Sequence, residues 1–312
     1  MSYQFHTVDV FTDTQFGGNQ LAVLPHARGL TVEQMQSITR EFNFSETVFV
    51  LPPENPGHTR RLRIFTPGSE LPFAGHPTVG AAFVLAATGD IPLAGDETRI
   101  VFEEGVGPIP VLIKSKEGKP FFTELSVAKM PHRWPGNYDL ETIARVLSVE
   151  PRDIETDGAY SIEGFSAGLP FVFVPMRDLA ALGRARPNLD AWEKSLRGSW
   201  SPDIYMFCER EDSASRNGVS NGDSVLQVRM FAPLLGVPED PATGSAGAAF
   251  GGYLAQRSSR RDGTLRHTLH QGVEMGRPSK LMVEVDLVGG EVRAVRVGGA
   301  SVLVSSGTLH VP

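Results

Sequence analysis

The feature that most constrains the fold is a short block of sequence that occurs twice in the same order. Arg63–Pro67 reads RIFTP and Arg229–Pro233 reads RMFAP, and the tetrapeptide GAAF then begins at Gly80 and again at Gly247. The spacing between the two blocks differs by only one residue from copy to copy. Two ordered matches at one spacing are less probable by chance than a lone tetrapeptide, so we interpret the chain as two homologous halves.

Each copy has a glycine and a polar residue directly before a helix of small residues. These pairs are Gly75-His76 in the first half and Gly244-Ser245 in the second. The start of a helix exposes unpaired backbone N–H groups and a partial positive charge, which together hold a carboxylate or a developing oxyanion. We therefore predict that the duplicated part of the chain is scaffold and anion cradle, and that the reactive residues differ between the copies.

The remaining sequence is dominated by short strand patterns separated by Gly and Pro. Strands are predicted at residues 6–12, 47–52, 61–67, 98–104, 108–114, 171–175, 203–209, 224–233, 281–288 and 301–311. Helices are predicted at residues 30–43, 76–89, 138–149 and 245–257. The first helix has a capping box of Thr31 and Gln34 and an apolar face of Val32, Met35 and Ile38. Many strands with few helices predict an α+β fold rather than a regular βαβ alternation.

A boundary between the halves is predicted near residues 128–139. Pro131 and Pro135 bracket polar, turn-forming residues there. The predicted domains are residues 1–130 and 131–312, and a return of residues 300–312 to the first half remains open.

Composition narrows the class of protein. The chain of 312 residues is 41% hydrophobic, carries a net charge of −7 and scatters its basic residues, which argues against nucleic acid or an anionic membrane as partner. The first residues lack the pattern of a signal peptide, and the most apolar run, Val79–Ala87, is about half a membrane span. The single cysteine, Cys208, cannot form an intrachain disulfide. We expect a protein of the reducing cytoplasm.

Five stretches of the chain form a distinctive set: VDVFTDTQFGGNQLAV (8–23), NFSETVFV (43–50), RIFTPGSELPFAGHPTVG (63–80), RMFAPLLGVPEDPATGSA (229–246) and QGVEMGRPSKLMVEV (271–285). In this order they resemble the PhzF family, the phenazine-biosynthesis isomerase-like group of the diaminopimelate epimerase fold. The resemblance implies two pseudo-symmetric domains, each a β-sheet or barrel wrapped around a central helix. It also implies an active site between the domains and, commonly, a homodimer.

The same resemblance implies roles for individual residues. The catalytic acid/base of the family falls on Glu46, its histidine on His76 and its aspartate on Asp240. Substrate-binding positions fall on Ser45, Gly75, Gly244 and Ser245. The implied reaction moves a proton across a small carboxylate-bearing substrate, as in the isomerisation of trans-2,3-dihydro-3-hydroxyanthranilate, without a cofactor.

The residues themselves allow a simpler interpretation beside each role. Glu46 follows a polar serine but is flanked by apolar residues, which favour the neutral form of a carboxyl and suit a proton carrier near neutral pH. His76 and Asp240 also fit a turn or a cap, and Ser245 is a natural N-cap. Cys208 lies in a strand pattern and is expected to be a packing thiol. The eight histidines lack metal-ligand spacing, so no metal is expected.

Two other functions are weighed against the isomerase. A two-base amino-acid epimerase of the same fold would need two thiols facing each other, whereas the chain has one cysteine and carries Gly75 at the equivalent position of the first loop. A non-catalytic protein that binds small molecules could keep the acid, the imidazole and the aspartate. Exchange of substrate hydrogen with solvent deuterium distinguishes the isomerase from the binding protein.

Overall fold

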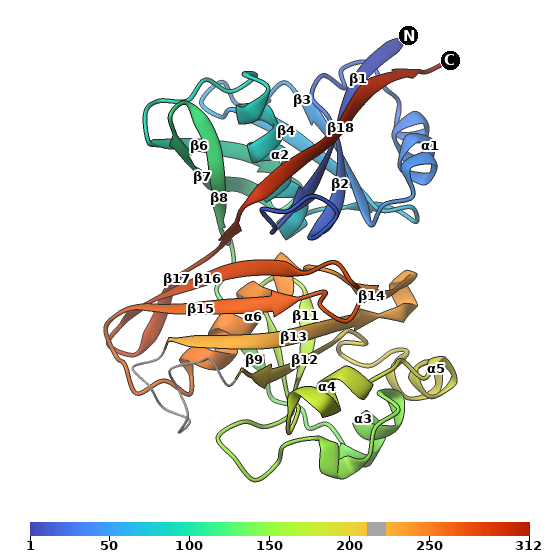
Figure 1. Cartoon of the computed structure of the whole chain (residues 1–312), viewed down its shortest axis with the longest axis vertical. Helices are drawn as coiled ribbons and strands as arrows, with labels where there is room; N and C mark the ends of the chain where they lie inside the picture. Colours follow the sequence, from blue (N-terminus) through green and yellow to red (C-terminus); the bar gives the residue numbers. More distant parts are fainter. Residues whose placement is uncertain (211–222) are drawn as a thin grey trace. The chain divides into compact units, whose positions relative to one another are not determined.

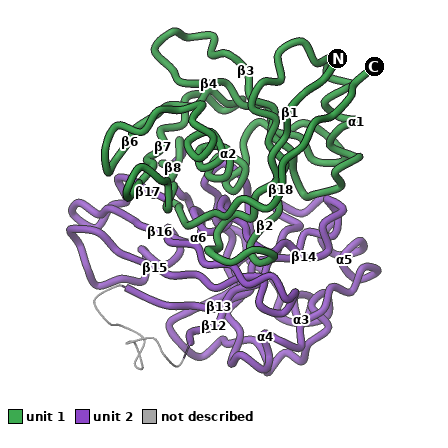
Figure 2. Tube along the Cα trace, turned by 45° about the horizontal axis from the view of Figure 1, so that its top comes forward, with its two compact units in different colours: residues 1–128, 297–312 green, residues 129–296 purple. Residues whose placement is uncertain are grey.

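The computed structural model describes residues 1–210 and 223–312, which form two compact units. Unit 1 is Met1–Ala128 together with Val297–Pro312, and unit 2 is Lys129–Arg296 (Figure 2). The last residues of the chain therefore belong with the first. No helix among the described residues is long and apolar enough to cross a membrane.

Unit 1 is a sheet that surrounds one helix. Its elements are β1 (Ser2–Val10), β2 (Asn19–Leu24), α1 (Val32–Phe42), β3 (Glu46–Leu51), β4 (Arg60–Phe65), β5 (Glu70–Leu71), α2 (Gly75–Ala87), β6 (Glu97–Glu104), β7 (Gly107–Lys116), β8 (Lys119–Ser126), the end of β17 (Glu291–Gly299) and β18 (Ser301–His310). The helix α2 contacts β1, β2, β3, β7, β8 and β18 (Figure 1). It is buried from Gly75 to Ala86, because its side chains are apolar or small on every side.

Unit 2 repeats this plan around α6 (Gly244–Ala255). Its other elements are β9 (His132–Trp134), α3 (Leu140–Val146), a 3₁₀ turn (Pro151–Asp153), β10 (Glu163–Ser166), β11 (Pro170–Pro175), α4 (Leu179–Arg184), α5 (Leu189–Leu196), β12 (Ile204–Glu209), β13 (Ser224–Ala232), a second 3₁₀ turn (Pro233–Leu235), β14 (Val237–Asp240), β15 (Gly263–Gln271) and β16 (Ser279–Val288). The helix contacts β9, β10, β11, β15 and β16.

The order of strand pairing confirms the two-fold repeat. In unit 1, β1–β2 is antiparallel, β2–β3 parallel, β3–β4 and β4–β5 antiparallel, β4–β6 parallel and β6–β7 antiparallel. In unit 2, the pairs β10–β11, β11–β12, β12–β13, β13–β14, β13–β15 and β15–β16 follow the same order of senses. The central helix enters at the same place in each unit, after the short strand β5 or β14. The predicted α+β class and pseudo-symmetry are thus confirmed.

The duplicated RxFxP blocks have a structural reason. In unit 1, Arg63 donates from Nε and Nη2 to the two carboxylate oxygens of Glu70, at 2.7 and 2.6 Å. In unit 2, Arg229 donates in the same way to Glu239, at 2.8 Å for both bonds. Each guanidinium also lies over the phenylalanine ring two residues further on, at 5.2 and 4.8 Å from the centroid. The block therefore fastens the short hairpin that leads into each central helix.

Most predicted elements are present, with local differences. The capping box of Thr31 and Gln34 is confirmed, and Met35 and Ile38 are buried. Val32 was placed wrongly on the buried face: it is 47% exposed, because it begins the helix outside the cluster that Met35 and Ile38 join. The strands that were not predicted are β2, β5, β8, β9, β10, β14, β15 and β17, and the short helices α4 and α5 were not predicted either.

Candidate active site

Glu46 is held at the start of β3. Asn43 ends α1 in the left-handed conformation, with φ of 53°, and three residues later the chain enters the strand at Glu46. There Glu46 lies opposite Leu21 of β2 in the parallel pair. Its side chain is 16% exposed, so the carboxyl is largely removed from water.

His76 lies at the start of α2 and faces this carboxyl. Its Nε2 atom is 3.5 Å from Oε2 of Glu46. Burial lowers the pKa of His76 from 6.5 to about 3, and a backbone hydrogen bond with Gln20 only partly opposes this shift. The imidazole is therefore neutral at physiological pH, and it lies beside Glu46 as an uncharged group rather than as a cation.

Asn19 connects Ser45, just before β3, with His76 of α2, and it was not predicted as a site residue. The Ser45 hydroxyl donates to Oδ1 of Asn19 at 3.1 Å, and Nδ2 of Asn19 lies 3.3 Å from Nδ1 of His76. Asn19 is buried, and Gly18 before it has φ of +60°, where an added Cβ would lie 2.4 Å from the Val10 carbonyl oxygen. This Gly-Asn pair is the signal that the sequence offered, because only glycine fits the close approach.

In unit 2, Asp240 ends β14 and is buried in a polar network. The Thr243 hydroxyl donates to its Oδ2 at 2.5 Å, and Gln271 donates from Nε2 to the Asp240 carbonyl oxygen at 2.8 Å. Nε2 of Gln271 also lies 2.9 Å from the Thr243 hydroxyl, and its Oε1 accepts from the Thr243 backbone N–H at 3.1 Å. Asp240 is thereby fixed one turn before α6.

The prediction that Ser245 caps α6 is wrong. The N-cap is Thr243, and the helix begins at Gly244, so that Ser245 is its second residue. Thr243 makes no side-chain cap, because its hydroxyl is bound to Asp240. Ser245 thus keeps a hydroxyl within the first turn that the helix does not need for capping.

The two central helices differ from the other α-helices of the described chain at their first turn. Side chains cap α1, α3, α4 and α5, from Thr31, Asp139, Asp178 and Asn188 respectively. By contrast, α2 has Ala74 as its N-cap, and neither α2 nor α6 has a side-chain cap. Their first N–H groups are left for another acceptor.

The predicted site residues therefore fall into two sets. Unit 1 brings together Ser45, Glu46 and His76, with Gly75 at the start of α2. Unit 2 holds Asp240, Gly244 and Ser245 around the start of α6.

Cys208 lies elsewhere, in the core of unit 2, where burial first of all raises the pKa of its thiol to about 11. Among the described residues, no three His, Cys, Asp or Glu side chains gather as metal ligands would.

Two units of this topology, each a sheet around an uncapped central helix, define the diaminopimelate epimerase-like class of fold. A hydroxyproline epimerase of Agrobacterium vitis shares it, with a TM-score of 0.62 over 99% of this chain and 91% of the other at 13% identity. A protein of Bacillus anthracis described as a phenazine biosynthesis protein of the PhzF family is more similar, with a TM-score of 0.84 over the full length of both chains at 26% identity.

The chain belongs to the PhzC-PhzF family of phenazine biosynthesis-like proteins, whose family model matches residues 8–307. It is 40% identical to an uncharacterised isomerase of Mesorhizobium japonicum over 97% of both chains. It is 31% identical to the trans-2,3-dihydro-3-hydroxyanthranilate isomerase of Pseudomonas aeruginosa over 99% of this chain and all of the other. The family and the fold together make the protein an isomerase.

Proposed function

We propose that the protein moves a proton within a small cyclic amino- or hydroxy-acid by general acid/base catalysis, with Glu46 as the proton carrier and without a cofactor. The contact of 3.5 Å between Glu46 and the neutral His76 carries the proposal, because it places a carboxyl beside an uncharged imidazole at an uncapped helix start. A carboxyl that can take a proton at one carbon and return it at another needs no second base. The reaction of the Pseudomonas relative is of this kind.

His76 is proposed to position the substrate and Glu46. Asn19 links His76 to Ser45, since the Ser45 hydroxyl donates to Oδ1 of Asn19 and Nδ2 of Asn19 lies 3.3 Å from Nδ1 of His76. A neutral imidazole in this position does not lock the Glu46 carboxyl in its charged form.

An anion-binding role is proposed for the first turn of α2 and, separately, for the first turn of α6. Both lack a side-chain cap, and helix starts of this kind suit a carboxylate. Asp240, fixed by Thr243 and Gln271, is proposed to accept a hydrogen bond from an amine or hydroxyl of the substrate. Ser245 is proposed to add a hydroxyl donor at the same helix start.

Exchange in D₂O tests this mechanism. The wild type is incubated with trans-2,3-dihydro-3-hydroxyanthranilate and with related cyclic amino-acids, and deuterium incorporation is followed by NMR. Glu46→Gln should lower exchange and turnover by about 10²–10⁴-fold while calorimetric binding survives, because the amide cannot accept the proton. Glu41→Gln, on the exposed surface of α1, is the matched control.

Turnover of Glu46→Gln within a few-fold of the wild type would remove Glu46 from the mechanism. Binding by the wild type without any exchange would instead favour a protein that only binds the molecule.

We also propose a homodimer, which rests on the family resemblance alone. Sedimentation equilibrium should then give twice the mass of one chain, and a mass of one chain at micromolar concentration would contradict it.

A further inference from the structure

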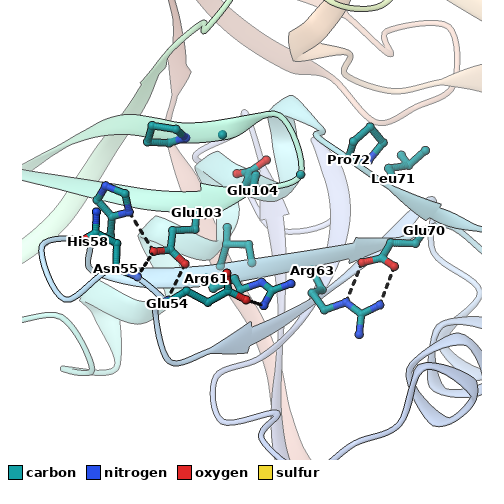
Figure 3. Close-up of a pocket in the computed structure, with 14 residues that line it drawn as sticks. Glu54, Asn55, His58, Arg61, Arg63, Glu70, Leu71, Pro72, Glu103 and Glu104 are labelled. Atoms are coloured by element: carbon teal, nitrogen blue, oxygen red, sulfur yellow. Dashed lines mark hydrogen bonds and ion pairs between the residues drawn. The ribbon is translucent and has the colours of Figure 1, made fainter.

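Glu104 is a buried carboxyl of unit 1 that the proposed reaction does not use. It is the last residue of β6 and is 8% exposed. Glu103 before it points to the other face of the strand, where it accepts from His58 and from the backbone N–H groups of Glu54 and Asn55 (Figure 3). Residues of that face line an open cavity of about 610 Å³, which Glu104 also lines, and Oε1 of Glu104 shares a hydrogen bond with Thr78 of α2.

The contacts of the Thr78 hydroxyl indicate whether Glu104 carries a proton. Its hydroxyl oxygen lies 2.8 Å from the Ala74 carbonyl oxygen and 2.6 Å from Oε1 of Glu104. A hydroxyl has one hydrogen, so it can donate to only one of these two oxygens. Two oxygens at such a distance repel each other unless a hydrogen lies between them. Both contacts are satisfied only if Thr78 donates to Ala74 and Glu104 carries a proton that it donates to Thr78.

The surroundings of Glu104 favour the same protonation state. Its Oε2 atom is buried and makes no hydrogen bond to the described residues, so an ionised carboxylate would hold an unsolvated charge. Burial raises the pKa of Glu104 to about 8, and the hydrogen bond with Thr78 opposes the shift more weakly.

The titratable groups on the elements packed against Glu104 are His76 of α2, Arg60, Arg61 and Arg63 of β4, Glu70 of β5, and Lys114 and Lys116 of β7. Arg61 and Arg63 are paired with carboxylates of Glu54 and Glu70 (Figure 3), and burial keeps His76 neutral.

We infer that Glu104 is a protonated carboxylic acid that anchors the start of α2: it donates to the Thr78 hydroxyl, which in turn donates to the carbonyl oxygen of the N-cap residue Ala74. Glu104 is a positioning residue: it fixes the first turn that carries Gly75 and His76. Because it is neutral, it adds no negative charge to a helix start that is proposed to bind an anion. Only this last consequence rests on the proposed function.

The protonation state can be measured without a substrate. In protein labelled with ¹³C at the glutamate carboxyl, one resonance of the wild type should remain protonated at pH 7 and titrate near 8. This resonance should be missing from Glu104→Gln and present in the control Glu103→Gln, which changes the neighbour on the opposite face.

Infrared spectra of the wild type in D₂O should show the C=O stretch of a protonated carboxyl at pH 7, whether or not the variants fold. Glutamates that all titrate below about pH 5 would overturn the inference.

The positioning role has a separate readout in the unfolding equilibrium. The folded state keeps a proton that an unfolded glutamate releases above its ordinary pKa of 4.5, so this group makes stability fall as pH rises from 4.5 to about 8. The unfolding constant of the wild type should rise by about tenfold per pH unit relative to that of Glu104→Gln across this window. Glu104→Gln should keep the contact, because its amide donates to Thr78, while Thr78→Val should lose it. Equal pH slopes for wild type and Glu104→Gln would also overturn the inference.

If these measurements succeed and no exchange activity is found, the inference stands and the proposed reaction fails. If exchange is found but Glu104 is ionised at pH 7, the reverse holds.

Discussion

At the scale of single residues, the His76 imidazole and the Glu104 carboxyl, which both lie at the first turn of α2, are neutral. Burial lowers the pKa of His76 and raises the pKa of Glu104. Desolvation therefore keeps both the base and the acid in their neutral forms. Each is held by a short polar chain, through Asn19 to Ser45 and through Thr78 to Ala74. The helix start keeps its positive potential for a ligand.

The neutral state of His76 predicts a loss of stability in acid. The unfolded chain binds a proton at this residue below pH 6.5, whereas the folded chain does so only near pH 3, so stability falls as pH drops through this interval. His76→Gln should remove up to about 1.4 kcal/mol of this loss per pH unit, measured as the free energy of unfolding in urea. The exposed His132 provides the control, His132→Gln. If the free energy of unfolding of His76→Gln falls in acid as steeply as that of the wild type, the expected burial of His76 is contradicted.

At the scale of elements, unit 1 and unit 2 use the same arginine–glutamate bridge in different surroundings. The Arg229 side chain is 2% exposed and also donates to the carbonyl oxygens of Leu182 and Ala185, whereas the Arg63 side chain is 19% exposed. A buried pair that loses one partner leaves an uncompensated charge, while an exposed pair returns its partner to water. The copies should therefore respond differently to the same substitution.

We expect Glu239→Gln to cost more than Glu70→Gln, which should cost about 1 kcal/mol or less, because only the first leaves a buried guanidinium whose remaining carboxylate, Glu274, lies 3.9 Å away. Chemical denaturation of the two variants, side by side with wild type, measures the difference. Equal costs would mean that the buried bridge is relaxed by water or by a movement of α4.

The sequence predicted elements whose causes are local and missed those whose causes are distant. The capping box of Thr31 depends on residues three apart, and the alternating strands carry their own pattern. By contrast, Thr243 rather than Ser245 is the N-cap residue of α6, and Gln271, far along the chain, holds the Thr243 backbone and hydroxyl. Asn19 likewise acquires a place at the site only through contacts with Ser45 and His76. The repeat predicted the scaffold, but not which polar groups it brings together.

At the scale of the whole molecule, the chain returns at its end to the place where it began. In unit 1, β1 pairs with β18 from Ser2 opposite His310 to Val10 opposite Ser301, and the two ends lie side by side (Figure 1). Val311 joins a core cluster with Tyr3. The sheet of unit 1 is therefore complete only when residues from both ends are in place.

Removal of residues 301–312 should unfold unit 1 and spare unit 2. The deletion exposes the edge of β1 and the face of α2 that contacts β18, while the pairs β12–β13 and β15–β16 keep all their partners. Hydrogen exchange followed by mass spectrometry should show lost protection in β1 to β4 and retained protection in β12 and β13. Removal of Pro312 alone is the control, and retained protection of β1 in the longer deletion would contradict the expectation.

This closure has a consequence for synthesis. A ribosome releases β1 to β8 first, yet their sheet must wait for β18, and all of unit 2 leaves the tunnel in between. At ~5–20 residues per second, that interval lasts roughly 10 to 35 s. During this time the nascent chain carries an unpaired β1 edge, while unit 2 already has its complete set of strands. Unit 2, which is synthesised later, can therefore fold before unit 1. A chaperone that binds the nascent protein would act on the amino-terminal residues of unit 1.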